Sequence, residues 1–245
     1  MHVVVTRPVR DAEPFKSRLE EFGCRVMLAP LFEVVARDIA ADVLDGAAAL
    51  IVTSRNALSA LAASPALPSA VDLPIYVVGP GTAAAAQKMG FKQIIEGAGR
   101  AEDLVPVLAA NRPLGGRLIY LRGDVLAFDL EAALAESGVN IEAVLAYRAV
   151  AAETLPAEVI KALQTGGIDA VTLMSPRTAR IWARLVAALS PPVQLSGLAF
   201  LCLSERVGQA LGQSVKADNI WVASHPNVEE MLALVKRLAA SSKAE

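Results

Sequence analysis

The chain alternates between short apolar runs and longer segments whose apolar residues recur at helical spacing. Residues 3–5 form a β-branched run, and the next segment places Phe15, Leu19 and Phe22 on one helical face before an apolar run at residues 24–28. Apolar runs separated by amphipathic segments are typical of parallel strands that helices cover on both faces. The pattern therefore predicts an α/β fold built from right-handed βαβ units.

The same pattern continues to the end of the chain, apart from two extended stretches of a different kind. Residues 30–38 carry charges at Glu33, Arg37 and Asp38, which do not suit a buried central strand, and residues 145–150 are similar in character. Elsewhere, apolar runs predict further strands near residues 49–52, 74–78, 94–95, 117–121, 141–144, 170–174, 198–203 and 220–222. We interpret the two extended stretches as connections between two domains.

The economical arrangement is two parallel-sheet, flavodoxin-like lobes, of which the first is discontinuous, joined by a two-stranded linker. The first domain would comprise residues 1–31 and 152–245, the inserted domain residues 38–144, and the linker strands residues 32–37 and 145–151. A ligand would then bind between the lobes, outside the carboxyl ends of the strands.

Composition narrows the possible partners. The 245 residues carry a formal net charge of -2, so no global positive field recruits nucleic acid or an anionic membrane. No apolar run approaches the roughly 20 residues that cross a bilayer, and the amino terminus lacks a secretory pattern, so we expect a cytoplasmic protein. Cys24 and Cys202 are expected to be buried free thiols rather than a disulfide or part of a metal site.

Hydroxyl groups, glycines and arginines recur where predicted strands turn into helices. A helix that begins at such a corner presents backbone N–H groups and a positive dipole end, and arginine binds carboxylates with two parallel hydrogen bonds. Each hydroxyl taken singly also suits a helix cap, and each arginine a solvated surface. Taken together, they predict a site for a multiply charged anion. The candidate binding residues are Arg7, Thr53, Ser54, Gly81, Thr82, Arg122, Ser175 and Ser204.

Several enzyme classes lack their signatures here. The sequence has neither a G-x-S-x-G elbow nor a GxxxxGK[ST] loop, and the turn at Gly79 and Gly81 has Ala84 where a dinucleotide loop needs its third glycine. The only histidines, His2 and His225, lie at the terminus and at a helix entrance, so neither is a good candidate for a general base.

The motifs, in this order and spacing, resemble the uroporphyrinogen-III synthase family along nearly the whole chain. They lie at residues 5–8, 51–54, 78–83, 121–123, 146–148, 173–176 and 223–227. The resemblance implies two α/β lobes joined by a two-stranded ladder and an enzyme without metal or organic cofactor. It also implies a carbon–oxygen lyase that removes water from hydroxymethylbilane and closes it, with inversion of ring D, through azafulvene and spiro intermediates. Tyr147 matches the family tyrosine that assists departure of the hydroxyl group.

The chain also departs from the family pattern. Ser204 is followed by Glu205 where the family usually has glycine, proline and threonine, and Asp124 stands where glycine or arginine is expected. We therefore rank Arg122 below Tyr147 and Thr82. The expected partner is the small-molecule substrate, bound by a monomer with at most transient contacts to neighbouring pathway enzymes. The alternative hypothesis is a bilobal binding or sensor protein that does not turn over its ligand.

Overall fold

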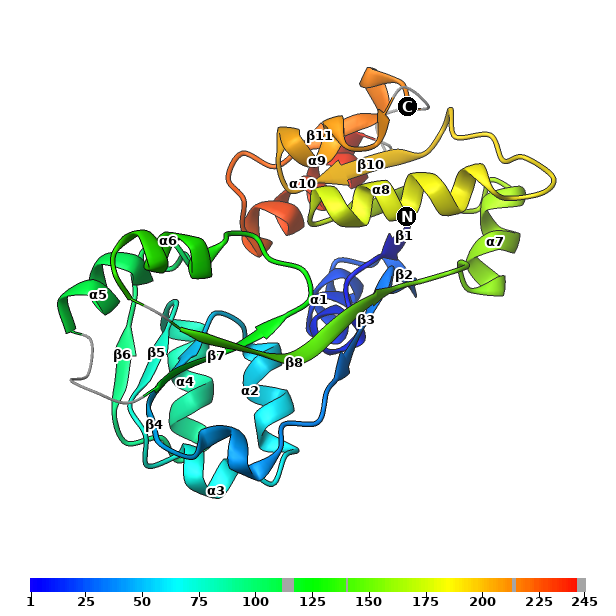
Figure 1. Cartoon of the computed structure of the whole chain (residues 1–245). Helices are drawn as coiled ribbons and strands as arrows, with labels where there is room; N and C mark the ends of the chain where they lie inside the picture. The colour runs from blue at the N-terminus through cyan, green and yellow to red at the C-terminus, as the bar shows by residue number, and fades with distance from the viewer. Residues whose placement is uncertain (112–116, 140, 213–214, 242–245) are drawn as a thin grey trace. The chain divides into compact units, whose positions relative to one another are not determined.

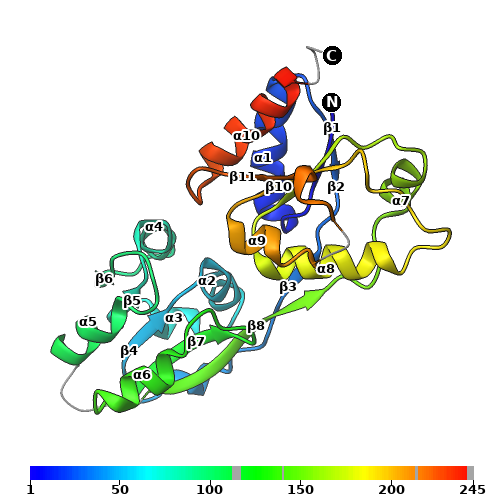
Figure 2. The ribbon, with the colours of Figure 1, turned by 90° about the horizontal axis from the view of Figure 1, so that it is seen from above.

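The computed structural model describes residues 1–111, 117–139, 141–212 and 215–241. The chain divides into two compact units, which consist of Met1–Glu33 with Val150–Glu245 (unit 1) and of Val34–Ala149 (unit 2). Helices cover a β-sheet in each unit (Figures 1 and 2). The predicted α/β fold with two mainly parallel sheets is confirmed.

Unit 1 is built on a parallel five-stranded sheet with the order β11-β10-β9-β1-β2. Its strands are β1 (His2–Val5), β2 (Arg25–Leu28), β9 (Ala170–Leu173), β10 (Ala199–Cys202) and β11 (Ile220–Val222). Its helices are α1 (Val9–Glu21), α7 (Ala157–Gln164), α8 (Pro176–Ala187), α9 (Glu205–Gln209) and α10 (Val228–Ser241), with a 3-10 turn at Ala217–Asn219.

Successive strand residues of unit 1 enter two different cores, as the two-residue period of a strand requires. In β1, Val4 packs with α7, α8 and α9, whereas Val3 and Val5 pack with α1 and α10 on the other face. All three valines are fully buried. The apolar runs of the sequence are therefore continuous because both faces of the sheet are covered.

Unit 2 contains a six-stranded sheet with the order β3-β8-β7-β4-β5-β6. Its strands are β3 (Phe32–Ala36), β4 (Ala47–Val52), β5 (Ile75–Val77), β6 (Ile94–Glu96), β7 (Arg117–Gly123) and β8 (Glu142–Ala151). Its helices are α2 (Arg55–Ala62), α3 (Leu67–Ala70), α4 (Pro80–Lys88), α5 (Leu104–Asn111) and α6 (Leu130–Glu136), with a 3-10 turn at Ala41–Leu44. Leu50 and Val52 of β4 pack with α2, α3 and α4, and Ala49 and Ile51 pack with α5 and α6.

The strands by which the chain enters and leaves unit 2 form an antiparallel pair. The N–H of Ala152 donates to the carbonyl of Leu31, and the N–H of Arg37 donates to the carbonyl of Ala146, so β3 and β8 run in opposite directions. Strand β8 runs from Glu142 to Ala151 and is therefore longer than the predicted linker strand at residues 145–151. The charge of Glu33 is tolerated because this residue is exposed on β3, which lies at the edge of its sheet.

The two sheets differ in strand order. In unit 1 the order β2-β1-β9-β10-β11 is that of flavodoxin, and the chain changes direction across the sheet between β1 and β9. In unit 2 the parallel strands run β6-β5-β4-β7-β8, which is the Rossmann order without its sixth strand, and the change of direction lies between β4 and β7. Ligands of open α/β sheets bind outside the carboxyl ends of the strands at such a switch point.

Candidate functional site

The switch point of unit 2 brings hydroxyl groups from separate strands together. Thr53 and Ser54 follow β4, and the half-buried Thr53 hydroxyl lies 3.0 Å from the Tyr120 hydroxyl of β7. Ser54 is the N-cap of α2, where its hydroxyl accepts a hydrogen bond from the N–H of Asn56 at 3.2 Å. Both predicted residues therefore lie at this edge. Ser54 has a capping bond, and Thr53 faces a phenol.

Tyr120 is a residue of the site that sequence reasoning missed. It is 1% exposed and lies within an apolar strand, so its pattern is that of a core residue. The available signal was chemical, because a buried tyrosine hydroxyl needs a hydrogen-bond partner. Burial raises the pKa of Tyr120, the hydrogen bond with Thr53 opposes that rise, and charge on Tyr147 raises the pKa further.

Tyr147 lies in β8, half-buried, and packs against the core that Leu50 and Val52 enter, on the face of the sheet opposite to Tyr120. It pairs in register with Gly123, the last residue of β7. The end of its ring lies directly over Gly123, since a Cβ built on this glycine would be 2.8 Å from the Tyr147 hydroxyl oxygen. The phenol is thus held at the carboxyl end of β7.

Arg122 has partners within unit 2. Its Nη1 donates to the carbonyl of Gly123 at 3.1 Å, and its buried Nε lies 2.8 Å from Oε1 of Glu131. The contact with Glu131 is an ion pair without the geometry of a hydrogen bond, which leaves Nε without a hydrogen-bond partner among the described residues. Glu131 offsets part of the positive charge that this corner would otherwise present to an anion.

The turn between β5 and α4 presents glycine more openly than threonine. Gly81 is exposed, and a Cβ built on it would meet nothing within 4 Å. Thr82 is 6% exposed and lies on the buried side of α4. The N-cap of α4 is Gly79, in extended conformation, and Pro80 is the first helical residue. The predicted corner exists, and its accessible part is backbone rather than the Thr82 side chain.

Unit 1 places its predicted residues around its own sheet edge. Arg7 follows β1, where its Nη2 lies 3.7 Å from Asp11 Oδ2. Ser175 follows β9 and forms a reciprocal capping box with Thr178 at the start of α8. Ser204 follows β10 and is the N-cap of α9, with no side-chain capping bond. Arg7 and Ser175 therefore flank the switch point of unit 1, and Ser204 lies one strand further.

Not every hydroxyl at a strand end is a helix cap. Thr6 is fully buried, and its hydroxyl donates to the carbonyl of Thr172 at 2.6 Å, whereas a capping hydroxyl would accept from an N–H at the start of α1, whose N-cap is Pro8. The Thr172 hydroxyl donates in return to the carbonyl of Val4 at 3.3 Å. A capping role for Thr6 is therefore wrong, because the close spacing of β1 and β9 offers a carbonyl acceptor instead.

The two cysteines are free and buried, as predicted. Burial raises the pKa of Cys202 to about 12, so its thiol stays protonated and inert at neutral pH. Within the described ranges, no group of three or more histidine, cysteine, aspartate or glutamate side chains is arranged to hold a metal ion. No helix in this part of the chain is long and apolar enough to cross a membrane.

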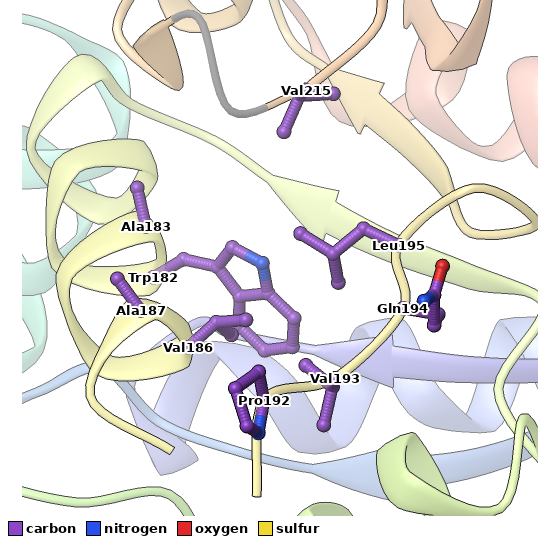
Figure 3. Close-up of a pocket in the computed structure, with 9 residues that line it drawn as sticks. All are labelled: Trp182, Ala183, Val186, Ala187, Pro192, Val193, Gln194, Leu195 and Val215. Carbon is purple, nitrogen blue, oxygen red and sulfur yellow. The ribbon is translucent and has the colours of Figure 1, made fainter. Parts of the chain in front are cut away.

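A separate pocket of about 320 Å³ lies in unit 1 between α8 and the segment that follows it (Figure 3). Its lining is mostly apolar and contains none of the predicted site residues. The lining residues are Trp182, Ala183, Val186, Ala187, Pro192, Val193, Gln194, Leu195 and Val215. Trp182 is 1% exposed, and its indole nitrogen is both buried and without a hydrogen-bond partner in the described structure. The indole N–H is covered rather than presented to a ligand, so the pocket is not the candidate site.

Comparison with known proteins agrees with the resemblance in the sequence. Residues 13–233 match the family model described as uroporphyrinogen-III synthase HemD. The structure is similar to a uroporphyrinogen-III synthetase from Helicobacter pylori, with a TM-score of 0.70, 20% identity, and coverage of 97% of this chain and 99% of that one. A mutant uroporphyrinogen III synthase from the extremely thermophilic bacterium Thermus thermophilus has a TM-score of 0.56, 21% identity, and coverage of 98% and 99%. A search of curated proteins found no match.

Proposed function

The chain belongs to the uroporphyrinogen-III synthase family, whose members are enzymes of tetrapyrrole synthesis, and we propose that it cyclises hydroxymethylbilane to uroporphyrinogen III by a carbon–oxygen lyase reaction without a cofactor. The single observation that carries this proposal is the family match over residues 13–233. The phenol of Tyr147, which lies over Gly123 at the carboxyl end of β7, supports it with chemistry suited to the first step.

That first step is loss of the substrate hydroxyl group as water, which leaves a cationic azafulvene. A phenol carries its proton at neutral pH and can donate it, or a hydrogen bond, to the departing oxygen. Tyr147 is our candidate for this role, because its ring end lies at the carboxyl edge of the sheet rather than in the core interior. Ring D then attacks through its substituted carbon, and the spiro intermediate rearranges before the macrocycle closes.

The remaining predicted residues are proposed to bind the acetate and propionate groups of the substrate. Backbone N–H groups at helix starts and nearby hydroxyl groups suit carboxylates. Catalysis would come mainly from orientation of a flexible substrate and from electrostatic stabilisation of the cationic intermediate. The proposed contacts are Arg7, Thr53, Ser54, Gly81, Thr82, Arg122, Ser175 and Ser204. We further propose a cytoplasmic monomer that meets neighbouring pathway enzymes only transiently.

The test uses the purified full chain and freshly prepared hydroxymethylbilane. After oxidation, chromatography separates the asymmetric product from the symmetric isomer that forms by spontaneous closure. We expect the asymmetric isomer to predominate and its rate of formation to scale with enzyme concentration. Formation of the symmetric isomer alone, at the rate of a protein-free control, would reject the synthase activity and favour a binding or sensor protein.

A further inference from the structure

The end of β7 holds β8 in an irregular register beside Tyr147. Arg122 pairs with Leu145, but the next residue, Gly123, pairs with Tyr147, so β8 contains one extra residue at this point. Such a bulge changes the direction in which the following side chains point. Here the residue immediately after the irregularity is Tyr147.

Gly123 leaves the space that the Tyr147 ring occupies. A Cβ built on Gly123 would lie 2.6 Å from Cζ, 2.7 Å from Cε2 and 2.8 Å from the hydroxyl oxygen of Tyr147. These distances are too short for non-bonded atoms, so an alanine here must displace the ring. The atoms concerned form the far end of a rotatable side chain, and the backbone conformation of Gly123 is open to other residues. A methyl group would therefore move the phenol and leave the strand in place.

Asp124 holds β8 on the other side of Tyr147. Its Oδ1 accepts a hydrogen bond from the N–H of Ala149 at 2.9 Å, two residues beyond the tyrosine. Strand β7 ends at Gly123, so a side-chain carboxylate continues the pairing where the backbone ladder has stopped. Asp124, which departs from the family pattern, thus forms a hydrogen bond to the strand that carries Tyr147.

We infer that Gly123 and Asp124 are positioning residues that determine where the hydroxyl group of Tyr147 lies, Gly123 by leaving room for the ring and Asp124 by anchoring the strand that carries it. The inference that this position matters for catalysis rests on the proposed function. The position of the Tyr147 hydroxyl group does not depend on that proposal and can be measured without substrate.

The first measurement is NMR of protein labelled with ¹³C at the tyrosine ring. The chain has three tyrosines, so the spectrum contains three ring environments, and Tyr120→Phe and Tyr147→Phe assign two of them. We expect Gly123→Ala to shift the Tyr147 signal. The matched control is Gly197→Ala, because Gly197 is exposed in unit 1 and a Cβ there would meet nothing within 4 Å. An unchanged Tyr147 signal in folded Gly123→Ala protein would overturn the inference, whatever the enzyme does.

The second measurement is turnover. Displacement of a catalytic group by about 1 Å can cost on the order of 10²-fold in rate, so Gly123→Ala should lower kcat by up to about 10²-fold with little change in KM. In the Tyr147→Phe background no hydroxyl remains to be misplaced, and Gly123→Ala should then change kcat by less than about twofold. Equal losses in both backgrounds would contradict action through Tyr147.

Asp124 is tested by a pair of substitutions. Asp124→Ala removes the acceptor for the Ala149 N–H, whereas Asp124→Asn retains a side-chain oxygen that can accept the same bond. We expect Asp124→Ala to shift the Tyr147 signal and lower kcat, and Asp124→Asn to restore most of both. If Asp124→Asn is impaired as much as Asp124→Ala, the charge of Asp124 rather than its hydrogen bond matters, and this part of the inference is overturned. It is also overturned if both variants behave like wild type.

Wild-type protein that makes only the symmetric isomer would reject the proposed function. The NMR result would still decide the inference about Gly123 and Asp124.

Discussion

The two switch points use their hydroxyl groups differently. In unit 1, Thr6 and Thr172 bond reciprocally to main-chain carbonyls across β1 and β9, and Ser175 is engaged in a capping box. In unit 2, the Thr53 hydroxyl lies 3.0 Å from the Tyr120 hydroxyl, and Tyr147 lies over Gly123 at the carboxyl end of β7. Hydroxyl groups at strand ends thus bond to main-chain groups in unit 1, whereas in unit 2 the Thr53 hydroxyl meets a side-chain phenol. The difference comes from the phenols that β7 and β8 bring to the edge of unit 2.

The aromatic residues divide in the same way. Both tryptophans and both cysteines belong to unit 1, and all three tyrosines belong to unit 2. Tryptophan fluorescence therefore follows unfolding of unit 1, and tyrosine absorbance follows unfolding of unit 2. Because each unit has its own spectroscopic probe, the unfolding of the two units can be measured separately.

The largest effect is expected from truncation of a core residue in each unit. Phe200 of β10 and Leu50 of β4 are fully buried. Phe200→Ala should lower the free energy of unfolding by about 3–5 kcal/mol, and Leu50→Ala by about 2–5 kcal/mol, because each leaves a cavity. Urea unfolding with both probes checks this. We expect Phe200→Ala to move the tryptophan transition and Leu50→Ala the tyrosine transition. Coincident movement of both in each variant would show that the units unfold as one block.

The next effect concerns chemistry in unit 2. Tyr147→Phe should lower kcat by about 10²-fold, equivalent to about 2.7 kcal/mol in the activation barrier, with little change in KM. Spontaneous closure then competes, so the fraction of symmetric isomer should rise. The control is Tyr76→Phe, which removes a hydroxyl from a buried strand residue of the same unit outside the site. A full rate for Tyr147→Phe would remove this residue from the mechanism without affecting the family assignment.

A smaller effect distinguishes two serines of unit 1. Ser175→Ala removes a hydroxyl that accepts the N–H of Thr178 at 3.1 Å, so we expect a loss of about 1 kcal/mol in stability. Ser204→Ala removes no capping bond and should change stability far less. Tryptophan fluorescence is a suitable probe because Trp182 lies in α8, the helix that Ser175 caps. Equal losses would mean that the capping box does not explain the role of Ser175.

The smallest effect is the pH dependence of a surface ion pair in unit 1. Arg18 of α1 donates two hydrogen bonds of 2.6 Å to Glu229 of α10, which lower the pKa of the glutamate from its ordinary 4.5. A lowered pKa means that the stabilisation is present above pH 4.5 and is lost as the pH falls through the folded-state value. The Tm difference between wild type and Glu229→Gln should therefore shrink below pH 4.5. Glu230→Gln, at the neighbouring position, is the control, and an equal pH dependence for it would contradict the assignment.

Much of the fold could be predicted because it follows from local patterns. Continuous apolar runs predicted strands buried on both faces, and β1 sends alternate valines into two cores. The start of the last helix is also set locally, because Oδ1 of Asn227 accepts the N–H of Glu230 at 2.9 Å. The strand order was not predictable in this way, because hydrophobic periodicity carries no information on which parallel strands are neighbours.

The candidate site was predictable only in part. Thr53 and Tyr147 stood out because one follows a strand and the other lies in an extended connection. Tyr120 was missed because its partner is 67 residues away in sequence. Thr82 was ranked high from its place in a motif, yet the rotation of α4 turns it toward the buried side.

By itself, the sequence determined the type and approximate extent of the elements and the buried thiols. These depend on side-chain periodicity, capping chemistry and composition, which act over a few residues. Only the tertiary structure decided that Tyr147 lies over Gly123, that Tyr120 meets Thr53 and that Asp124 anchors Ala149. Those contacts join different strands or strand ends, and their geometry is set by sheet order and register, which emerge when the whole unit packs.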